Sequence, residues 1–246
     1  MKIRLFTIPN LLTLSNLLCG SLAAVAALRY DNLVAAFWLI VLAAVFDFFD
    51  GFVARLLHQS GPLGVQLDSL ADDVTFGFAP AAVLFSLYGR SQSLWLPEET
   101  GYGLIVFFFA ACAALRLAKF NIDDTQRTEF CGLPSPAAAL FCASLGLLAS
   151  YGQEVSGGWL DLPREVILAV AIGMGLLMVS PIRMFALKFH GFGWRGNEIR
   201  YGFILASIVL IVLLQAASVP AIILLYVLVS LIRWLGQRSA VDAEEA

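Results

Sequence analysis

The sequence predicts an all-α polytopic membrane protein. Of its 246 residues, 60% are hydrophobic and only 13% are charged, whereas a soluble domain carries roughly 25% charged residues. The mean hydropathy is +0.86. Apolar stretches of the length that a helix needs to cross a bilayer, about 20 residues, recur along the chain. We expect about eight transmembrane helices, over residues 9–28, 33–57, 64–88, 102–121, 136–152, 164–184, 199–216 and 219–236.

Short polar turns separate the first and the last pairs of predicted helices. The Arg-Tyr-Asp-Asn sequence of 29–32 joins the first two, and the Ala-Ser-Val-Pro sequence of 217–220 joins the last two as a helical hairpin. We expect a single transmembrane domain over 1–246. It comprises six helices over about 8–184, the extra hairpin over about 199–236, and an acidic tail over 239–246 that is expected to be disordered.

The basic residues indicate how the helices are oriented. With eight spans and a cytoplasmic N-terminus, 12 of the 15 Lys and Arg residues fall on the cytoplasmic side, and only Arg29, Arg90 and Arg164 fall outside. Cytoplasmic loops of membrane proteins carry such an excess of positive charge. We therefore expect both termini, and the turn between the second and third helices, to lie in the cytoplasm.

Four aspartates interrupt the second and third apolar stretches. Asp47 and Asp50 are three residues apart, and Asp68 and Asp72 are four apart, so each pair lies on one face of its helix. Because the turn reverses the chain, the two pairs can face each other. Each ionised side chain near the bilayer centre costs about 2.5–3.5 kcal/mol on insertion scales, so one or two divalent cations are the expected partners. Asp73 points about 100° away from Asp72 on a helix and is expected outside this group.

Small residues surround these aspartates in the sequence. Gly51, Ala54 and Gly64 allow the close approach of a backbone or of a flat ligand. Arg55 lies one turn beyond Gly51, where it can meet a phosphate or close an ion pair.

The spacing of these residues resembles the signature of the CDP-alcohol phosphotransferases, integral membrane enzymes that move a phosphatidyl-type group from a CDP-linked lipid to an alcohol. The string is Asp47-x-x-Asp50-Gly51-x-x-Ala54-Arg55, eight further residues, and Gly64-x-x-x-Asp68-x-x-x-Asp72. The resemblance implies a divalent metal, Mg²⁺ or Mn²⁺, and a homodimer. It implies that the first three aspartates are metal ligands and that Asp72 is both a ligand and the general base. The implied CDP-binding residues are Gly51, Ala54, Arg55 and Gly64.

Further motifs resemble the bacterial phosphatidylserine synthases within that family. They are 8–13 with Asn16 and Gly20, 68–72, 76–81, 115–121 and 132–136. This resemblance implies CDP-diacylglycerol as the donor, L-serine as the acceptor, and phosphatidylserine and CMP as the products. The catalytic core would be the six helices over 8–184, in a bacterial inner membrane, with the active site facing the cytoplasm. Lys119 stands where the resemblance leads us to expect arginine, and lysine lacks the bidentate fork of arginine.

Polar residues near the same edge are candidates for binding the acceptor or a phosphate. Arg116, Lys119 and Asn121 lie at the cytoplasmic end of the fourth predicted helix, where they could bind the serine carboxylate or a lipid phosphate, or only anchor the helix. Asn10, Thr13 and Asn16, on the first helix, could contact the diphosphate or join neighbouring helices.

Two alternatives to this function stay open. The acceptor could be glycerol 3-phosphate, an inositol derivative or choline, because the aspartates serve phosphoryl transfer rather than the choice of acceptor. The protein could also be a cation transporter, since intramembrane carboxylates mark ion pathways. A transporter is expected to show repeated halves or discontinuous helices, and the sequence shows neither. Nothing in the sequence indicates a nucleic-acid partner.

Overall fold

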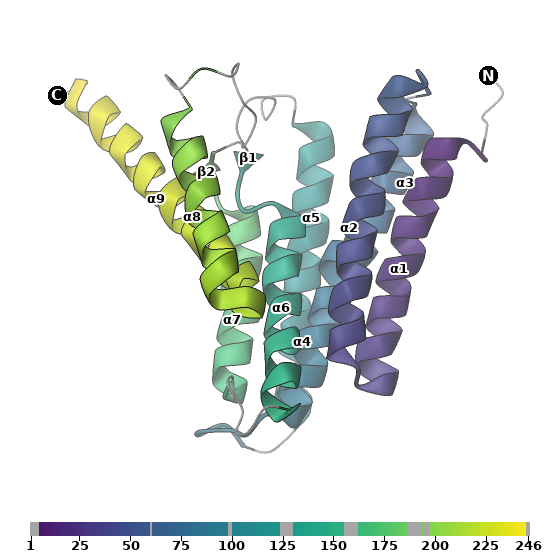
Figure 1. Cartoon of the computed structure of the whole chain (residues 1–246), viewed down its shortest axis with the longest axis vertical. Helices are drawn as coiled ribbons and strands as arrows, with labels where there is room; N and C mark the ends of the chain where they lie inside the picture. The colour runs from purple at the N-terminus through teal and green to yellow at the C-terminus, as the bar shows by residue number, and fades with distance from the viewer. Residues whose placement is uncertain are drawn as a thin grey trace.

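The structure is a computed structural model, and it describes residues 5–59, 61–97, 100–123, 130–154, 162–185, 193 and 197–244. In this part of the chain, most residues belong to α-helices that form one bundle (Figure 1). They are α1 (Ile8–Tyr30), α2 (Leu33–Leu56), α3 (Pro62–Asp72), α4 (Ala79–Arg90), α5 (Phe108–Ile122), α6 (Ser135–Glu154), α7 (Arg164–Val179), α8 (Glu198–Leu214) and α9 (Ser218–Glu244).

Shorter elements connect the helices. A π-helix, η1 (Asp73–Phe78), joins α3 to α4, and two 3₁₀ segments, η2 (Thr100–Phe107) and η4 (Gln215–Ala217), precede α5 and α9. Two strands, β1 (Phe130–Cys131) and β2 (Arg183–Met184), pair in antiparallel fashion, with Phe130 opposite Met184.

The predicted all-α membrane architecture is confirmed, but the count of eight spans is not. Within the described residues, five helical stretches are long and apolar enough to cross a membrane. The apolar part of α6, Ser135–Tyr151, is shorter than these stretches, and α7 has 16 residues. The five stretches are Ile8–Tyr30, Leu33–Leu56, Pro62–Arg90, Gly101–Ile122 and Glu198–Gly236.

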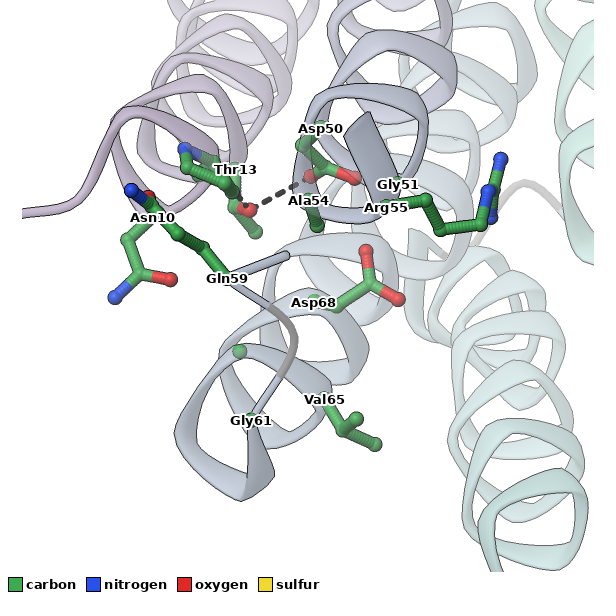
Figure 2. Close-up of a pocket in the computed structure, with 12 residues that line it drawn as sticks. Asn10, Thr13, Asp50, Gly51, Ala54, Arg55, Gln59, Gly61, Val65 and Asp68 are labelled. Atoms are coloured by element: carbon green, nitrogen blue, oxygen red, sulfur yellow. Dashed lines mark hydrogen bonds between the residues drawn. The ribbon is translucent and has the colours of Figure 1, made fainter. Parts of the chain in front are cut away.

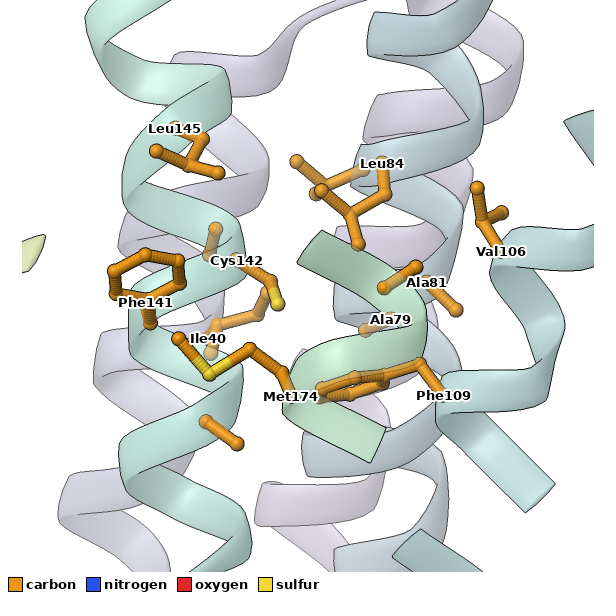
Figure 3. Packing of buried hydrophobic residues seen from close by; sticks show 14 of the residues in the cluster. Ile40, Ala79, Ala81, Leu84, Val106, Phe109, Phe141, Cys142, Leu145 and Met174 are labelled. Atoms are coloured by element: carbon orange, nitrogen blue, oxygen red, sulfur yellow. The ribbon is translucent and has the colours of Figure 1, made fainter. Parts of the chain in front are cut away.

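α4 lies at the centre of the bundle. Its residues Ala79, Ala81 and Leu84 are fully buried, and they belong to one apolar cluster with side chains from α2, α5, α6 and α7 (Figure 3). Small residues on α4 let these neighbours pack closely. Large apolar side chains such as Trp38 and Phe48 face outwards instead, which is the pattern expected of a surface that contacts lipid.

The first two helices form a hairpin that is tied to α4 at the end of the bundle opposite to both termini (Figure 1). Asn32 caps α2 by accepting a hydrogen bond from the backbone N–H of Ala35 at 2.9 Å. Asp31 ends α1 in a left-handed conformation with φ 51°. Its carboxylate accepts hydrogen bonds from Arg90 and from Ser86, both at 2.7 Å. These contacts fix α1 and α2 relative to α4.

Four elements differ from the sequence prediction. The sixth predicted helix, 164–184, ends at Val179 as α7, and residues 183 and 184 form the strand β2 instead. The third predicted helix, 64–88, is interrupted after Asp72 by the π-helix η1, whose wider turn accommodates one extra residue. The fourth begins as a 3₁₀ helix before it becomes α5. The tail over 239–246 was expected to be disordered, but α9 continues as a helix to Glu244.

Candidate active site

The aspartates of α2 and α3 converge at the end of the bundle where these two helices are joined. One carboxylate oxygen each from Asp47, Asp50 and Asp68 lies within 4.8 Å of the other two. Asp72, the last residue of α3, lies close enough to Asp47 and Asp68 to interact electrostatically with both. The two pairs therefore face each other across the helix interface, as their spacing predicts.

The donor set fits a divalent cation. Mg²⁺ and Mn²⁺ bind through carboxylate oxygens, and three such oxygens are gathered here. Within the described chain, no Lys, Arg or His forms a salt bridge with any of these aspartates. Oδ1 of Asp68 is buried, and it accepts no hydrogen bond from the residues that the structure describes. Since buried acceptors are nearly always satisfied, this oxygen indicates a ligand that the polypeptide does not supply.

Two side chains of α1 orient the aspartates. Thr13 Oγ1 donates a hydrogen bond of 2.6 Å to Oδ2 of Asp50, and Asn16 Nδ2 donates one of 3.1 Å to Oδ1 of Asp72. The sequence singles out Thr13 and Asn16 as polar residues of the first helix, but it does not decide between contact with the diphosphate and contact between helices. The signal was present, because Asn10, Thr13 and Asn16 recur every three residues on one face of α1 and all three are buried.

A cavity of about 170 Å³ opens beside the aspartates (Figure 2). It brings together all four predicted CDP-binding residues. A Cβ atom added at Gly51 would meet only Arg55 Nη1, at 3.6 Å, and one added at Gly64 would meet only Asn10 Oδ1, at 3.7 Å, so both glycines leave open space. The lining residues are Pro9, Asn10, Thr13, Asp50, Gly51, Ala54, Arg55, Gln59, Gly61, Gly64, Val65 and Asp68.

The candidate acceptor residues are divided between two places. Asn10 and Thr13 line the cavity beside the aspartates, whereas Arg116 and Lys119 line a second cavity, of about 280 Å³, between α5 and the end of α7. Asn121 lines neither of these two cavities. Its Nδ2 donates a hydrogen bond of 2.7 Å to Ser69 Oγ and so links α5 to α3.

Arg116 has the most informative surroundings of these candidates. Its Nη1 donates a hydrogen bond of 2.9 Å to Ser135 Oγ at the start of α6, a contact that the sequence analysis did not anticipate. Its Nε is buried without a partner among the described residues. The guanidinium group also lies close enough to Asp72 to interact electrostatically.

Comparison with known proteins places this site in a family. A family model described as CDP-alcohol phosphatidyltransferase matches residues 6–185, which is well over half of the chain and includes every aspartate of the cluster. The protein therefore belongs to the CDP-alcohol phosphatidyltransferase family.

Its relatives include proteins named CDP-diacylglycerol–serine O-phosphatidyltransferase. The protein from Helicobacter pylori is 32% identical over 233 residues, which cover 94% of this chain and 92% of the relative. The protein from Bacillus subtilis is 33% identical over 184 residues, covering 74% and 92%. The protein from the archaeon Methanocaldococcus jannaschii is 34% identical over 180 residues, covering 73% and 74%.

Proposed function

We propose that this protein transfers a phosphatidyl group from CDP-diacylglycerol to L-serine, and that it forms phosphatidylserine and releases CMP. The observation that carries the proposal is the convergence of Asp47, Asp50 and Asp68 beside a glycine-lined cavity. The names of relatives that match most of the chain support serine as the acceptor.

The aspartate cluster would hold Mg²⁺ or Mn²⁺, as one or two ions, through Asp47, Asp50 and Asp68, with Asp72 as a further ligand. When bound, the cation would neutralise charge on the diphosphate and on the departing CMP. Gly51, which has open space beside it, and its neighbours in the cavity would then accommodate the CDP group.

The polypeptide itself would supply the proton transfer and the binding of phosphate. Asp72 takes the proton of the serine hydroxyl as the serine oxygen attacks the phosphorus that carries diacylglycerol, and the bond from that phosphorus to the CMP oxygen breaks. Arg55, on the wall of the cavity, is placed to bind a phosphate oxygen. No Ser–His or Cys–His pair lines the cavity, which supports direct displacement rather than a covalent intermediate.

The acceptor would be bound from the side of α5. Arg116 is the strongest candidate to bind the serine carboxylate, because its buried Nε lacks a partner among the described residues and its guanidinium lies near Asp72. Lys119 and Asn121 are weaker candidates, since both are exposed and Asn121 already bonds to Ser69. Asn10 and Thr13, which line the other cavity, would contact the diphosphate.

We place the site on the cytoplasmic side of a bacterial inner membrane, with both termini on that side and with the protein acting as a homodimer. This location suits the substrates, because the acyl chains stay in the bilayer while serine and CMP exchange with the cytoplasm. The distribution of basic residues supports this orientation.

The test is the incorporation of radiolabelled serine into lipid by purified protein with CDP-diacylglycerol. We expect product only when Mg²⁺ or Mn²⁺ is present, and its loss in EDTA. Asp72→Asn should abolish transfer while leaving the protein folded. Incorporation of glycerol 3-phosphate, inositol phosphate or choline in place of serine would contradict the proposed acceptor, and a burst of CMP without serine would contradict direct displacement.

A further inference from the structure

Asn16, on α1, forms hydrogen bonds with the segment in which α3 is followed by η1. Its side chain is fully buried. The Nδ2 group donates to Oδ1 of Asp72 at 3.1 Å, and the backbone carbonyl accepts a hydrogen bond of 3.2 Å from Thr75 Oγ1. One residue of α1 therefore holds both the last residue of α3 and the first turn of η1.

The packing of the two backbones fixes this contact. Gly20 lies one turn beyond Asn16, and a Cβ atom there would lie 2.2 Å from Thr75 Oγ1 and 2.7 Å from Thr75 Cα. Only a glycine allows this approach. The separation between Asn16 and Asp72 is thus set by two helices in direct contact rather than by flexible side chains.

In the hydrogen bond between these two side chains, Asn16 is the donor and Asp72 is the acceptor. An amide N–H is a neutral donor and occupies one oxygen of the Asp72 carboxylate, which leaves the other oxygen available to a second partner. The reverse orientation of the amide would place two acceptor oxygens against each other. A hydrogen bond to one oxygen also restrains rotation of the carboxylate, and such positioning of a reacting group contributes to rate.

We propose that Asn16 is a positioning residue for the reaction. It holds the carboxylate of Asp72 in the orientation that accepts the proton of the acceptor hydroxyl. This inference rests on the proposed function and on the role of Asp72 as the base within it.

A purely structural role for Asn16 makes a different prediction, and the chain offers a matched control. Asn16→Leu removes the amide at nearly constant size, whereas Thr75→Val removes the hydrogen bond to the Asn16 backbone and leaves the amide on Asp72 in place. Both changes remove one hydrogen bond between α1 and the α3–η1 segment, so both should lower thermal stability. Only the first should affect the chemical step.

The experiment measures serine-dependent release of CMP by detergent-purified variants, together with their thermal unfolding. For Asn16→Leu we expect kcat to fall by about 10- to 100-fold, less than the loss of a general base itself, with the KM for CDP-diacylglycerol within about twofold of wild type. For Thr75→Val we expect kcat within about threefold of wild type. The difference in kcat between the two variants distinguishes a positioning role of Asn16 from a general loss of stability.

Several outcomes would overturn the inference. One is an unchanged kcat for Asn16→Leu. Another is an equal loss of kcat in Asn16→Leu and Thr75→Val. Asn16→Ala serves as a second variant without added bulk, and if neither Asn16 variant yields folded protein while Thr75→Val does, Asn16 is a folding residue. Wild-type protein without serine-dependent CMP release would contradict the proposed function, whereas active wild type with an unaffected Asn16→Leu contradicts this inference alone.

Discussion

At the scale of single residues, Asp50 offers the sharpest test of metal binding. It is 6% exposed, accepts a hydrogen bond from Thr13, and contributes one of the three clustered carboxylate oxygens. Asp50→Ala removes one donor of the set, so the Mg²⁺ or Mn²⁺ concentration that gives half-maximal activity should rise by about two orders of magnitude, or activity should be lost. A metal titration of the serine-transfer rate measures this.

The matched control for Asp50→Ala is Asp31→Asn. Asp31 pairs with Arg90 at the opposite end of the bundle. Loss of the Asp31 charge should leave the metal dependence of activity unchanged, although it weakens the contact between Asp31 and Arg90 of α4. An equal shift in both variants would show that the metal requirement follows overall stability and not the aspartate cluster.

Gly51 tests the proposed binding of CDP in the cavity beside the aspartates. Since an added Cβ would meet only Arg55 Nη1, at 3.6 Å, the fold should tolerate Gly51→Leu, and the larger side chain should fill space that the CDP group needs. We expect binding of CDP-diacylglycerol to weaken by at least about tenfold, the effect of roughly 1.4 kcal/mol. Equilibrium binding of a labelled donor checks this. Gly173→Leu, on α7 where nothing lies within 4 Å, is the control, and unchanged donor affinity for Gly51→Leu would make Gly51 a packing residue.

The sequence predicted which residues converge here, but not how α1 holds them. Helical spacing alone placed Asp47 with Asp50 and Asp68 with Asp72, because a period of 3.6 residues is a local property. The bond from Asn16 to Asp72 joins residues 56 positions apart, and it depends on how two helices pack. Asp73 was expected outside the ligand set. In the structure its Oδ1 is buried and directed towards Gly77.

At the scale of elements, hydropathy located the helices but not the change in helix type. The predicted first helix, 9–28, and second helix, 33–57, agree with α1 and α2 to within two residues at each end. The π-helix η1 was not predicted, because its residues are as apolar as those of the α-helix that was expected. In the structure η1 packs closely against α1 at Gly20, and a hydropathy window along one segment does not contain such a contact between distant segments.

This contact predicts the effect of Gly20→Ala. The added Cβ would lie 2.7 Å from a backbone atom of Thr75, so η1 has to move away from α1. We expect a loss of about 1–3 kcal/mol in the free energy of unfolding, as for other overpacked sites. Thermal unfolding in detergent measures it. Gly89→Ala, on α4 with nothing within 4 Å, should be neutral or slightly stabilising, and equal behaviour of the two variants would argue against a tight α1–η1 contact.

The last hairpin lies beyond the family match, which ends at residue 185. It is anchored by Tyr226 of α9, whose hydroxyl donates to the carbonyl of Phe185 at 3.0 Å, while its ring packs against those of Phe185 and Phe203. Tyr226→Phe should lower the free energy of unfolding by about 0.5–1.5 kcal/mol. The serine-transfer rate per folded molecule should be preserved. A loss of rate without a loss of stability would instead place α9 in the site.

At the scale of the whole molecule, both termini and the turn between α2 and α3 lie at the same end of the bundle (Figure 1). The aspartates and the cavity lie close to this turn. The excess of Lys and Arg at this end predicts that it faces the cytoplasm. Charge counting predicts the side of the membrane from the sequence alone, whereas the convergence of the aspartates depends on how α1, α2 and α3 pack.

This orientation predicts which positions can be labelled from outside the cell. In a Cys131→Ser background the three remaining cysteines, Cys19, Cys112 and Cys142, are buried, so a single new cysteine reports its own exposure. Gln92→Cys, in the exposed segment after α4, should react with a membrane-impermeant maleimide on intact spheroplasts. Gln59→Cys, in the lining of the cavity beside the aspartates, should react only after the membrane is opened. If Gln59→Cys reacts on intact spheroplasts and Gln92→Cys does not, the cavity faces outwards, where cytoplasmic serine does not reach it.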